Sequence, residues 1–426
     1  MERVDIIGGG LSGSEAAWQL AERGIPVRLW EMRPALMTPA HHSGLLGELV
    51  CSNSLGSDHD STASGLLVRE MEFYNSLVVQ AARAARVAAG GALAVDREAF
   101  SAFITHRLSN HPQVQIIREE YTELPQERAI IASGPLTSEK LAQSIARQLG
   151  VGLLFFFDAA APVVYGESID MSKVFRASRY GKGGADYLNC PLERDEYEAF
   201  YNALMTAETA PLKDFERKFF EHCLPVEELA RRGPKTLTFG PLKPVGLENP
   251  RTGRRPWAVV QLRAEDNFGQ LWNLVGFQTN LRWSEQKRVF RMLPGLEQAE
   301  FARYGVMHRN SFIDSPRVMA GNYRLKNFVN VYIAGQLSGV EGYMESAASG
   351  LTAALDLSLR LRGEELKLPP ETMLGALADH VTRPTPDFQP MNANFGLLPP
   401  GEPLRDKKER RRALAARALA NLVRIL

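Results

Sequence analysis

Cysteine is scarce in this 426-residue chain and occurs only at Cys51, Cys190 and Cys223. The three residues are far apart and form no CxxC pair, so the sequence predicts neither a zinc site nor a disulfide framework. We therefore expect no metal centre. Each cysteine has to be considered singly, as a structural residue or as a reactive thiol.

Long hydrophobic runs are also absent, and none approaches the roughly 18 residues of a membrane span. We expect no signal peptide, because Ile6 and Ile7 lead directly into a glycine-rich turn. A hydrophobic content of 45% and a charged content of 23% are typical of a globular protein. We expect a cytoplasmic protein without a membrane partner. Its 426 residues predict two or three domains, and the oligomeric state stays open.

A large net charge is lacking as well, since the formal value is +1. The balance is uneven, however. Residues 405–424 include eight Lys/Arg and two Asp/Glu, so the rest of the chain is net acidic. Such a basic tail is a candidate phosphate-binding element, with a solvated helix face as the alternative. Leu419, Leu422, Val423 and Leu426 recur at helical spacing, so one side should pack on the body. The candidate RNA contacts are Lys407, Lys408, Arg410, Arg411 and Arg412.

Glycine, in contrast, is concentrated near the start of the chain. The apolar run Arg3–Ile7 is followed by Gly8-x-Gly10-x-x-Gly13, then by a predicted helix over Ser14–Arg23. A second strand over Pro26–Trp30 ends at Glu31. This order of strand, glycine turn, helix, strand and acid is the dinucleotide-binding fingerprint.

Each part of the fingerprint has a physical role. Gly8 permits the tight turn, Gly10 lets a pyrophosphate approach the backbone, and Gly13 lets the helix lie close to the sheet. The helix N-terminus offers free N–H groups to phosphates, and Glu31 can accept hydrogen bonds from a ribose diol. The acid favours FAD or NAD over a 2′-phosphorylated nucleotide. Further contacts are expected from Leu11 and Ser12 in the turn and from Arg33 after the second strand.

The following segments carry the other candidate residues. Residues 34–60 read as a loop near the cofactor and contain Cys51, which is either a structural or a reactive thiol. Residues 62–88 and 212–232 are predicted to be helical, and Cys223 lies in the second of these segments. Between Met171 and Gly184 basic residues alternate with aromatics and no acid intervenes, which suits a nucleic-acid surface or a mobile surface loop. The basic residues concerned are Lys173, Arg176, Arg179 and Lys182.

Residues 330–336 predict a late strand that ends at Gly335-Gln336, and a helix rich in small residues opens at Gly342-Tyr343. Flavoproteins of this architecture use such a return strand for the ribityl chain, so FAD is favoured over NAD. Gln336 stands where an acid is usual. The predicted fold is α/β, a Rossmann-like FAD-binding domain interrupted by an α+β insertion domain. Its first part covers residues 1–154, the insertion 155–305, and the return strand, helix and basic tail 306–426.

Several longer motifs resemble those of the folate- and FAD-dependent tRNA (uracil-5-)-methyltransferases, and the resemblance covers essentially the whole chain. The motifs are EMRP (31–34), TPAHH (38–42), ELVCSNS (48–54), IASGPLTS (131–138), AGQLSGVEGYMES (334–346) and MNANFGLLPP (391–400). The resemblance implies tightly bound FAD, 5,10-methylenetetrahydrofolate, NADPH or NADH, and the T-loop uridine at tRNA position 54. It places two functional cysteines at Cys51 and Cys223 and a flavin-stacking aromatic at Tyr343. Cys190 matches no such role and is expected to be structural.

The implied chemistry requires a thiolate, because uracil C5 is a poor nucleophile until a group adds at C6. We assign that addition to Cys223 and place Cys51 nearer the flavin, with an exchange of the two roles as the alternative. Three other functions remain open. The first is a flavoenzyme that modifies another tRNA uridine, such as the wobble position, and the second is a non-catalytic flavin-bearing RNA-binding protein. The third is an NAD-linked oxidoreductase, which would bind free nicotinamide cofactor at Gly8–Gly13 and no flavin.

Overall fold

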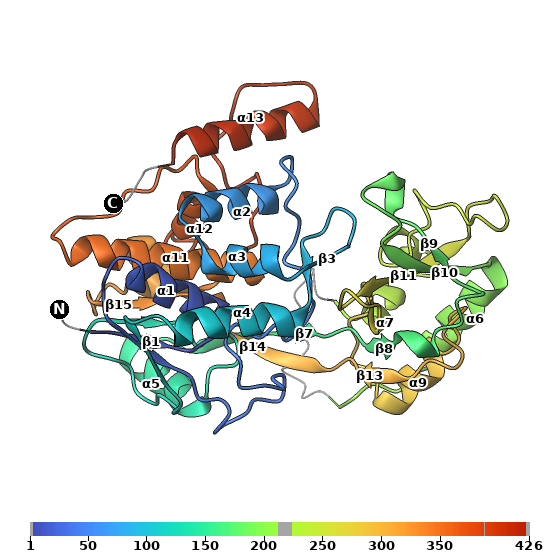
Figure 1. Cartoon of the computed structure of the whole chain (residues 1–426), viewed down its shortest axis with the longest axis horizontal. Coiled ribbons are helices and arrows are strands. Elements are labelled where there is room, and N and C mark those ends of the chain that lie inside the picture. Colours follow the sequence, from blue (N-terminus) through green and yellow to red (C-terminus); the bar gives the residue numbers. More distant parts are fainter. Residues whose placement is uncertain (1–2, 212–223, 387, 423–426) are drawn as a thin grey trace.

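Two sheets organise the chain, one parallel and one antiparallel, and they lie in different parts of the molecule (Figure 1). The computed structural model describes residues 3–211, 224–386 and 388–422. The left-hand part of Figure 1 contains both the beginning and the end of the described chain, whereas the right-hand part is built from its middle. This arrangement agrees with the predicted α/β fold in which an FAD-binding domain is interrupted by an insertion.

The parallel sheet has five short strands in the order β15, β6, β1, β2 and β5. Its middle strands are short apolar runs, which is expected where helices cover both faces. The strands are β1 (Val4–Ile7), β2 (Val27–Trp30), β5 (Val114–Ile117), β6 (Ala129–Ile131) and β15 (Val331–Ile333).

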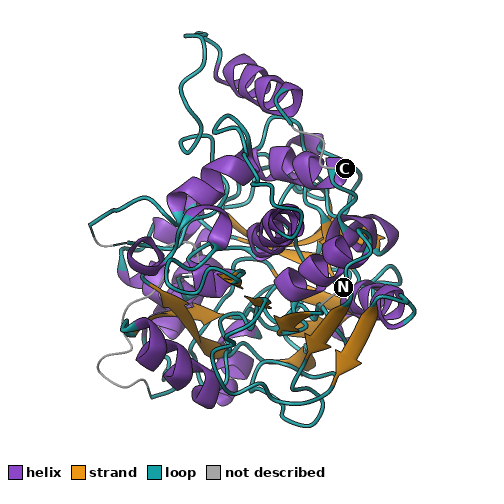
Figure 2. Cartoon of the chain, turned by 90° about the vertical axis from the view of Figure 1, so that its left-hand side faces the viewer, coloured by secondary structure: helices purple, strands orange, loops and turns teal. Residues whose placement is uncertain are grey.

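Helices enclose this sheet, as Figure 2 shows from the left-hand side of the molecule. In Figure 1, α5 lies beneath the sheet, whereas α1, α11, α2 and α12 are stacked above it, and α13 lies at the outer edge. Their bounds are α1 (Leu11–Ala21), α2 (Ala63–Phe73), α3 (Leu77–Ala84), α4 (Arg97–Ser109), α5 (Glu139–Leu149), α10 (Ser315–Val318), α11 (Tyr343–Arg360), α12 (Met373–His380) and α13 (Lys407–Ala420).

The antiparallel sheet has six strands in the order β13, β8, β12, β11, β10 and β9. They are β8 (Val163–Tyr165), β9 (Phe175–Arg176), β10 (Tyr187–Leu192), β11 (Ala258–Ala264), β12 (Leu271–Leu274) and β13 (Phe301–Arg303). The accompanying helices are α6 (Arg194–Met205), α7 (Val226–Arg231), α8 (Thr236–Phe239) and α9 (Trp283–Phe290).

A separate antiparallel ladder joins the two parts of the molecule. It consists of β7 (Leu153–Ala159) and β14 (Met307–Ile313), which are paired along their whole length. The small pair β3 (Arg86–Val87) and β4 (Ala94–Val95) lies close to the junction (Figure 1). The larger hydrophobic core draws on residues before β7 and after β13, and the second core on residues 164–301. The boundaries at 154 and 305 stay a prediction.

The structure differs from the sequence predictions in several local details. Residues 62–88 form two helices instead of one, because Asn75 adopts a left-handed φ of 57° and the Ser76 side chain caps the N-terminus of α3. In the segment expected to be helical over 212–232, residues 212–223 lie outside the described part, and α7 covers Val226–Arg231. Among the described helices, none is long and apolar enough to span a bilayer.

The two helices that begin near the parallel strand ends, α1 and α11, approach each other closely. A Cβ placed on Gly350 would lie 2.1 Å from the carbonyl oxygen of Ser12, so this contact excludes any side chain. We expect Gly350→Ala to lower the free energy of unfolding by about 1–3 kcal/mol, because overpacking forces the helices apart.

Chemical denaturation followed by circular dichroism measures this loss. The control is Gly91→Ala, because Gly91 has open space around its Cβ position and an ordinary φ. Equal unfolding midpoints for the two variants would contradict the proposed tight contact.

Candidate functional site

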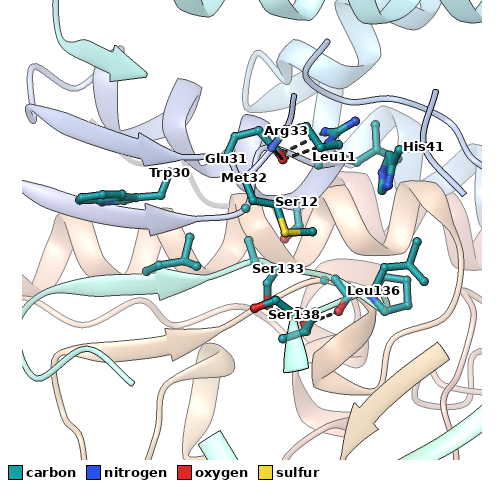
Figure 3. Close-up of a pocket in the computed structure, with 18 of the residues that line it drawn as sticks. Leu11, Ser12, Trp30, Glu31, Met32, Arg33, His41, Ser133, Leu136 and Ser138 are labelled. Atoms are coloured by element: carbon teal, nitrogen blue, oxygen red, sulfur yellow. Dashed lines mark hydrogen bonds and ion pairs between the residues drawn. The ribbon is translucent and has the colours of Figure 1, made fainter. Parts of the chain in front are cut away.

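A pocket lies at the carboxyl ends of the parallel strands, where ligands bind in open α/β sheets. It comprises about 1000 Å³ of space, including the part open to solvent. Segments that are distant in the sequence meet there, and Figure 3 shows residues that follow β1, β2 and β6. Its lining includes Gly8, Gly10, Leu11 and Ser12 after β1, Glu31 and Arg33 after β2, Ser133–Ser138 after β6, and Gly335, Gln336 and Tyr343 after β15.

The turn between β1 and α1 is shaped by backbone contact. Gly8 has a φ of +107°, and a Cβ on Gly13 would lie 1.8 Å from the carbonyl oxygen of Gly8. Gly13 therefore serves helix packing and is not among the residues that line the pocket. Gly10 is the N-cap of α1 and supplies no side chain to the free N–H groups. These N–H groups are suited to an anionic ligand.

Glu31 is held in a defined orientation at the end of β2. Its carboxylate accepts hydrogen bonds from the backbone N–H groups of Gly9 (3.0 Å) and Arg33 (2.9 Å), and from the Arg33 side chain. Burial alone would raise the pKa of Glu31, but the hydrogen bonds and charge of Arg33 outweigh it and lower this pKa. Arg33 also pairs with Glu48 at 2.9 Å. The sequence predicts Arg33 as a cofactor contact, and its guanidinium binds these two carboxylates and the carbonyl oxygen of Ser43 at 3.4 Å. Figure 3 shows Arg33 beside Glu31.

The β15–α11 connection forms the other side of the pocket. Gln336, which stands where an acid is usual, donates a hydrogen bond to the nearby carboxylate of Glu341. The carboxylate at this position of the pocket therefore comes from Glu341, five residues after Gln336, and the sequence pattern did not predict it. Gly342 has a φ of +113° and is the N-cap of α11. It lies outside the lining, whereas the next residue, Tyr343, is part of it.

Cys51 is not among the residues that line this pocket, but it follows Val50 and contacts Tyr343, both of which are. Its backbone N–H donates to the hydroxyl of Tyr343 at 2.7 Å, and its sulfur is 3.8 Å from the carbonyl oxygen of Ala159. The structure thus brings together Cys51 and the aromatic residue that the sequence assigns to the flavin. Cys223 lies outside the described residues. Cys190 is fully buried, and burial strongly raises the pKa of its thiol, which fits a structural residue.

The predicted RNA contacts between 173 and 182 have different environments. Lys173 pairs with Glu297 at 2.7 Å, and both side chains are exposed. Arg176 is exposed, with its guanidinium 5.4 Å from the Trp272 ring, and Lys182 is exposed too. Arg179, in contrast, donates to the side chain of Gln261 and to the carbonyl oxygens of Lys243 and Val245. Its guanidinium is therefore occupied within the protein.

The C-terminal basic residues lie on α13, which packs against α2 through Ala415 and Ala418. Leu419 and Leu422 are partly buried there, as their spacing predicts, whereas Val423 and Leu426 lie outside the described residues. Arg412 is 3.4 Å from Asp60, and Arg411 lies over the Phe395 ring. The other predicted contacts, Lys407, Lys408 and Arg410, are exposed.

Sequence reasoning missed a set of charged residues behind Cys51. Arg97 donates to the carbonyl oxygen of Cys51 at 2.9 Å and pairs with Glu265. Glu265 also accepts from Arg303 at 3.0 Å, and Arg263 donates to the side chains of Ser52 and Asn53. No local motif could indicate these contacts, because the partners are up to 211 residues apart in the sequence.

Comparison with known proteins adds independent information. A family model described as "Glucose inhibited division protein A" matches residues 3–365. The Heliobacterium modesticaldum protein named Methylenetetrahydrofolate--tRNA-(uracil-5-)-methyltransferase TrmFO is 57% identical, over 99% of this chain and 98% of that protein. The protein of the same name from Geobacter sulfurreducens is also 57% identical, over 98% of each.

Among solved structures, Aquifex aeolicus GidA is similar with a TM-score of 0.68 at 16% identity. The similarity covers 89% of this chain and 67% of that one, and it supports the fold alone. The relatives at 57% identity match over essentially their full lengths. The chain therefore belongs to the glucose inhibited division protein A family and, within it, to the methylenetetrahydrofolate–tRNA-(uracil-5-)-methyltransferases.

Proposed function

We propose that this protein transfers a one-carbon unit from 5,10-methylenetetrahydrofolate to C5 of the T-loop uridine at tRNA position 54, where it is reduced to a methyl group. The observation that carries the proposal is the position of Cys51, whose backbone N–H is bonded to Tyr343 at the dinucleotide pocket. The shared name of relatives that are 57% identical over nearly the whole chain supports it.

The pocket residues fit FAD. The hydroxyl of Ser12 is buried in the pocket wall, and it has no hydrogen-bond partner among the described residues. It lies beside the free N–H groups at the start of α1, so both can bind a pyrophosphate. We assign Glu31 to the ribose, Gly335 and Gln336 to the ribityl chain, and Tyr343 to the flavin ring, since all four residues line the pocket. When bound, FAD supplies the hydride chemistry, and NADPH or NADH supplies its electrons.

The protein's own residues activate the uracil. A cysteine thiolate adds to C6, which makes C5 an enolate carbon that attacks the methylene group at the formaldehyde level. One bond from the methylene carbon to a folate nitrogen breaks as C5 attacks, and the second breaks as the C5 proton is lost. The exocyclic methylene then accepts a hydride, which bound FAD would supply, and the thiolate departs from C6 and restores the ring. Cys223 is our candidate for this addition, and Cys51, next to Tyr343, is assigned to protect or relay the methylene intermediate near the flavin.

Two exposed basic surfaces are proposed to bind tRNA. One is formed by Lys173, Arg176 and Lys182, and the other by the exposed basic side chains at the start of α13. Arg179 is left out of the first surface, because its guanidinium already binds three protein oxygens. The T-loop uridine is buried in folded tRNA, so the base has to be exposed before attack. Contacts to the phosphate backbone can hold the RNA while this occurs.

The direct test uses flavin-loaded protein, unmodified tRNA, NADPH and methylenetetrahydrofolate labelled in its methylene group. We expect labelled 5-methyluridine at position 54, located by nuclease digestion and mass spectrometry. A tRNA with cytidine at position 54 is the control and should remain unlabelled. Label at the wobble position, or none in folded tRNA, would contradict the proposal.

Removal of either functional cysteine should abolish methylation. We expect Cys51→Ala and Cys223→Ala each to reduce the single-turnover rate by at least about 100-fold, as for groups that take part directly in bond making. The matched control is Cys190→Ala, because Cys190 lies in the second core. It should lower stability by about 1 kcal/mol and leave the rate nearly unchanged. Full activity of Cys223→Ala would exclude our assignment of the attacking thiol.

Binding of tRNA should weaken steeply with salt. We expect the double variant Lys407→Gln/Arg410→Gln to bind tRNA more weakly and to reduce the slope of log K against log salt by about 0.8 for each lost phosphate contact. Filter binding across a salt series measures both effects. Lys140→Gln/Arg147→Gln is the control, because it removes two exposed charges from α5. If the two double variants show the same slope, α13 does not contact the RNA backbone.

A further inference from the structure

One face of β11 is polar although the strand is buried. Leu262 points into the second core, whereas its neighbour Arg263 points to the opposite face, opposite Tyr187 on β10 and Asn273 on β12. This polar face meets the larger domain. The Tyr187 hydroxyl donates to the carbonyl oxygen of Ala89 at 3.0 Å.

The same face holds the segment around Cys51, defined here as the Cys51 loop (residues 48–54). The Asn53 side chain is fully buried and donates to the carbonyl oxygens of Val95 and Ala264, both at 3.0 Å. Arg263 donates to the Asn53 side chain at 2.7 Å and to the Ser52 hydroxyl at 2.8 Å. The loop is therefore bonded on one side to its own domain and on the other to the insertion.

A second set of contacts ends at Cys51 itself. Arg97, at the start of α4, donates to the carbonyl oxygens of Leu49 (2.6 Å) and Cys51 (2.9 Å). Its guanidinium also pairs with Glu265, which follows β11 and is 4% exposed. Arg303 on β13 binds the same carboxylate from the other side. We call Arg97, Arg263, Arg303 and Glu265 the arginine network.

The arginine network has an excess of positive charge, because it contains three guanidinium groups and one carboxylate. Arg97 and Arg303 pair with Glu265, whereas Arg263 bonds to the Cys51 loop. Arg263 is 7% exposed, and the Arg303 side chain is 32% exposed. A network that served only to join the domains would be neutral, since uncompensated buried charge costs stability. Around the Cys51 loop, the charged and titratable side chains with described contacts are the arginine network, Tyr343 from α11 and Glu48, which is bound to Arg33.

We propose that the arginine network positions the Cys51 loop against the insertion and stabilises the thiolate form of Cys51 relative to the thiol, whose sulfur lies 3.8 Å from the carbonyl oxygen of Ala159. The proposal rests on the proposed function, which needs a reactive sulfur beside Tyr343. The network residues touch no reacting atom, so they are positioning residues.

Electrostatics supports this assignment. Burial lowers the pKa of Arg97, but Glu265 outweighs it, and a negative charge on Cys51 contributes in the same direction as Glu265. Burial likewise lowers the pKa of Arg263, and the charges of Tyr187, Glu265 and Cys51 oppose that effect. Because the interaction between two charges is mutual, both guanidinium groups favour the thiolate.

The test measures alkylation of Cys51 in the flavin-loaded protein. Iodoacetamide reacts with the thiolate, which displaces iodide, and mass spectrometry of the peptide that contains Cys51 reports this residue alone. We expect Arg303→Gln to raise the pH of half-maximal rate by about half to one unit, because it removes one of the three positive charges of the network while the charge of Glu265 remains. At pH 7 the rate should fall about three- to tenfold.

The matched variants separate charge from packing. Arg303→Lys keeps the charge and should leave the pH of half-maximal alkylation (the midpoint) unchanged. Glu265→Gln removes the negative charge and should lower the midpoint. Arg288→Gln removes an exposed arginine from α9, where it pairs with Glu285, and should have no effect. If Glu265→Gln does not retain flavin, Arg303→Glu replaces it, and its midpoint should rise about twice as far as that of Arg303→Gln.

Two results would overturn the proposal. One is an unchanged midpoint in Arg303→Gln, and the other is a rise in both Arg303→Gln and Glu265→Gln, which would indicate disruption of the loop instead of an effect of charge. The measurement needs neither tRNA nor folate. If the pH of half-maximal alkylation shifts as expected but the protein makes no 5-methyluridine, the role of the arginine network is supported and the proposed function is rejected.

Discussion

The close approach of α1 and α11 at Ser12 is the constraint on which the pocket depends. Gly13 allows α1 to lie against the β1 turn, and Gly350 allows α11 to lie against the carbonyl group of Ser12. Both helices begin at the pocket, so their N-termini converge on one space. A methyl group at either glycine would separate the parts that have to hold one ligand. Because the two glycines allow the helices to pack closely, the N-termini of both helices can contact the same ligand.

The insertion completes this site from outside the nucleotide-binding fold. Its antiparallel sheet has an apolar face, which forms a core of its own, and a polar face, which bonds to the Cys51 loop. Leu262 and Arg263 are adjacent in the sequence, and their side chains lie on opposite faces of the sheet because side chains alternate along a strand. The Cys51 loop is consequently held between the two parts of the molecule, and its geometry depends on how they are joined. Polar contacts suit such a junction, since they fix direction as well as distance.

The sequence predicted those features that depend on local patterns. The glycine turn, the acid at the end of β2 and the return strand each have a spacing that is physically required, and the structure shows all three at one pocket. Cys51 was expected near the cofactor because loops after strands border the ligand, and it lies beside Tyr343. The break at Asn75 was missed because tertiary packing and the Ser76 cap outweigh a continuous helical pattern. Arg179 looked like an RNA contact, since its partners, Lys243, Val245 and Gln261, are distant in sequence.

Positive charge is used in two physically different settings in this protein. On α13 it is exposed to solvent, where salt screens interactions beyond about 8–10 Å, so it acts mainly on a polyanion that comes into contact. Around Glu265 it is buried, where screening by salt is much weaker and each charge acts on its immediate neighbours. The formal net charge of +1 gives no indication of either group of positive side chains. Ionic strength should therefore change the affinity for RNA while it leaves the state of the Cys51 sulfur nearly constant, so that binding and reactivity are controlled by separate groups of arginines.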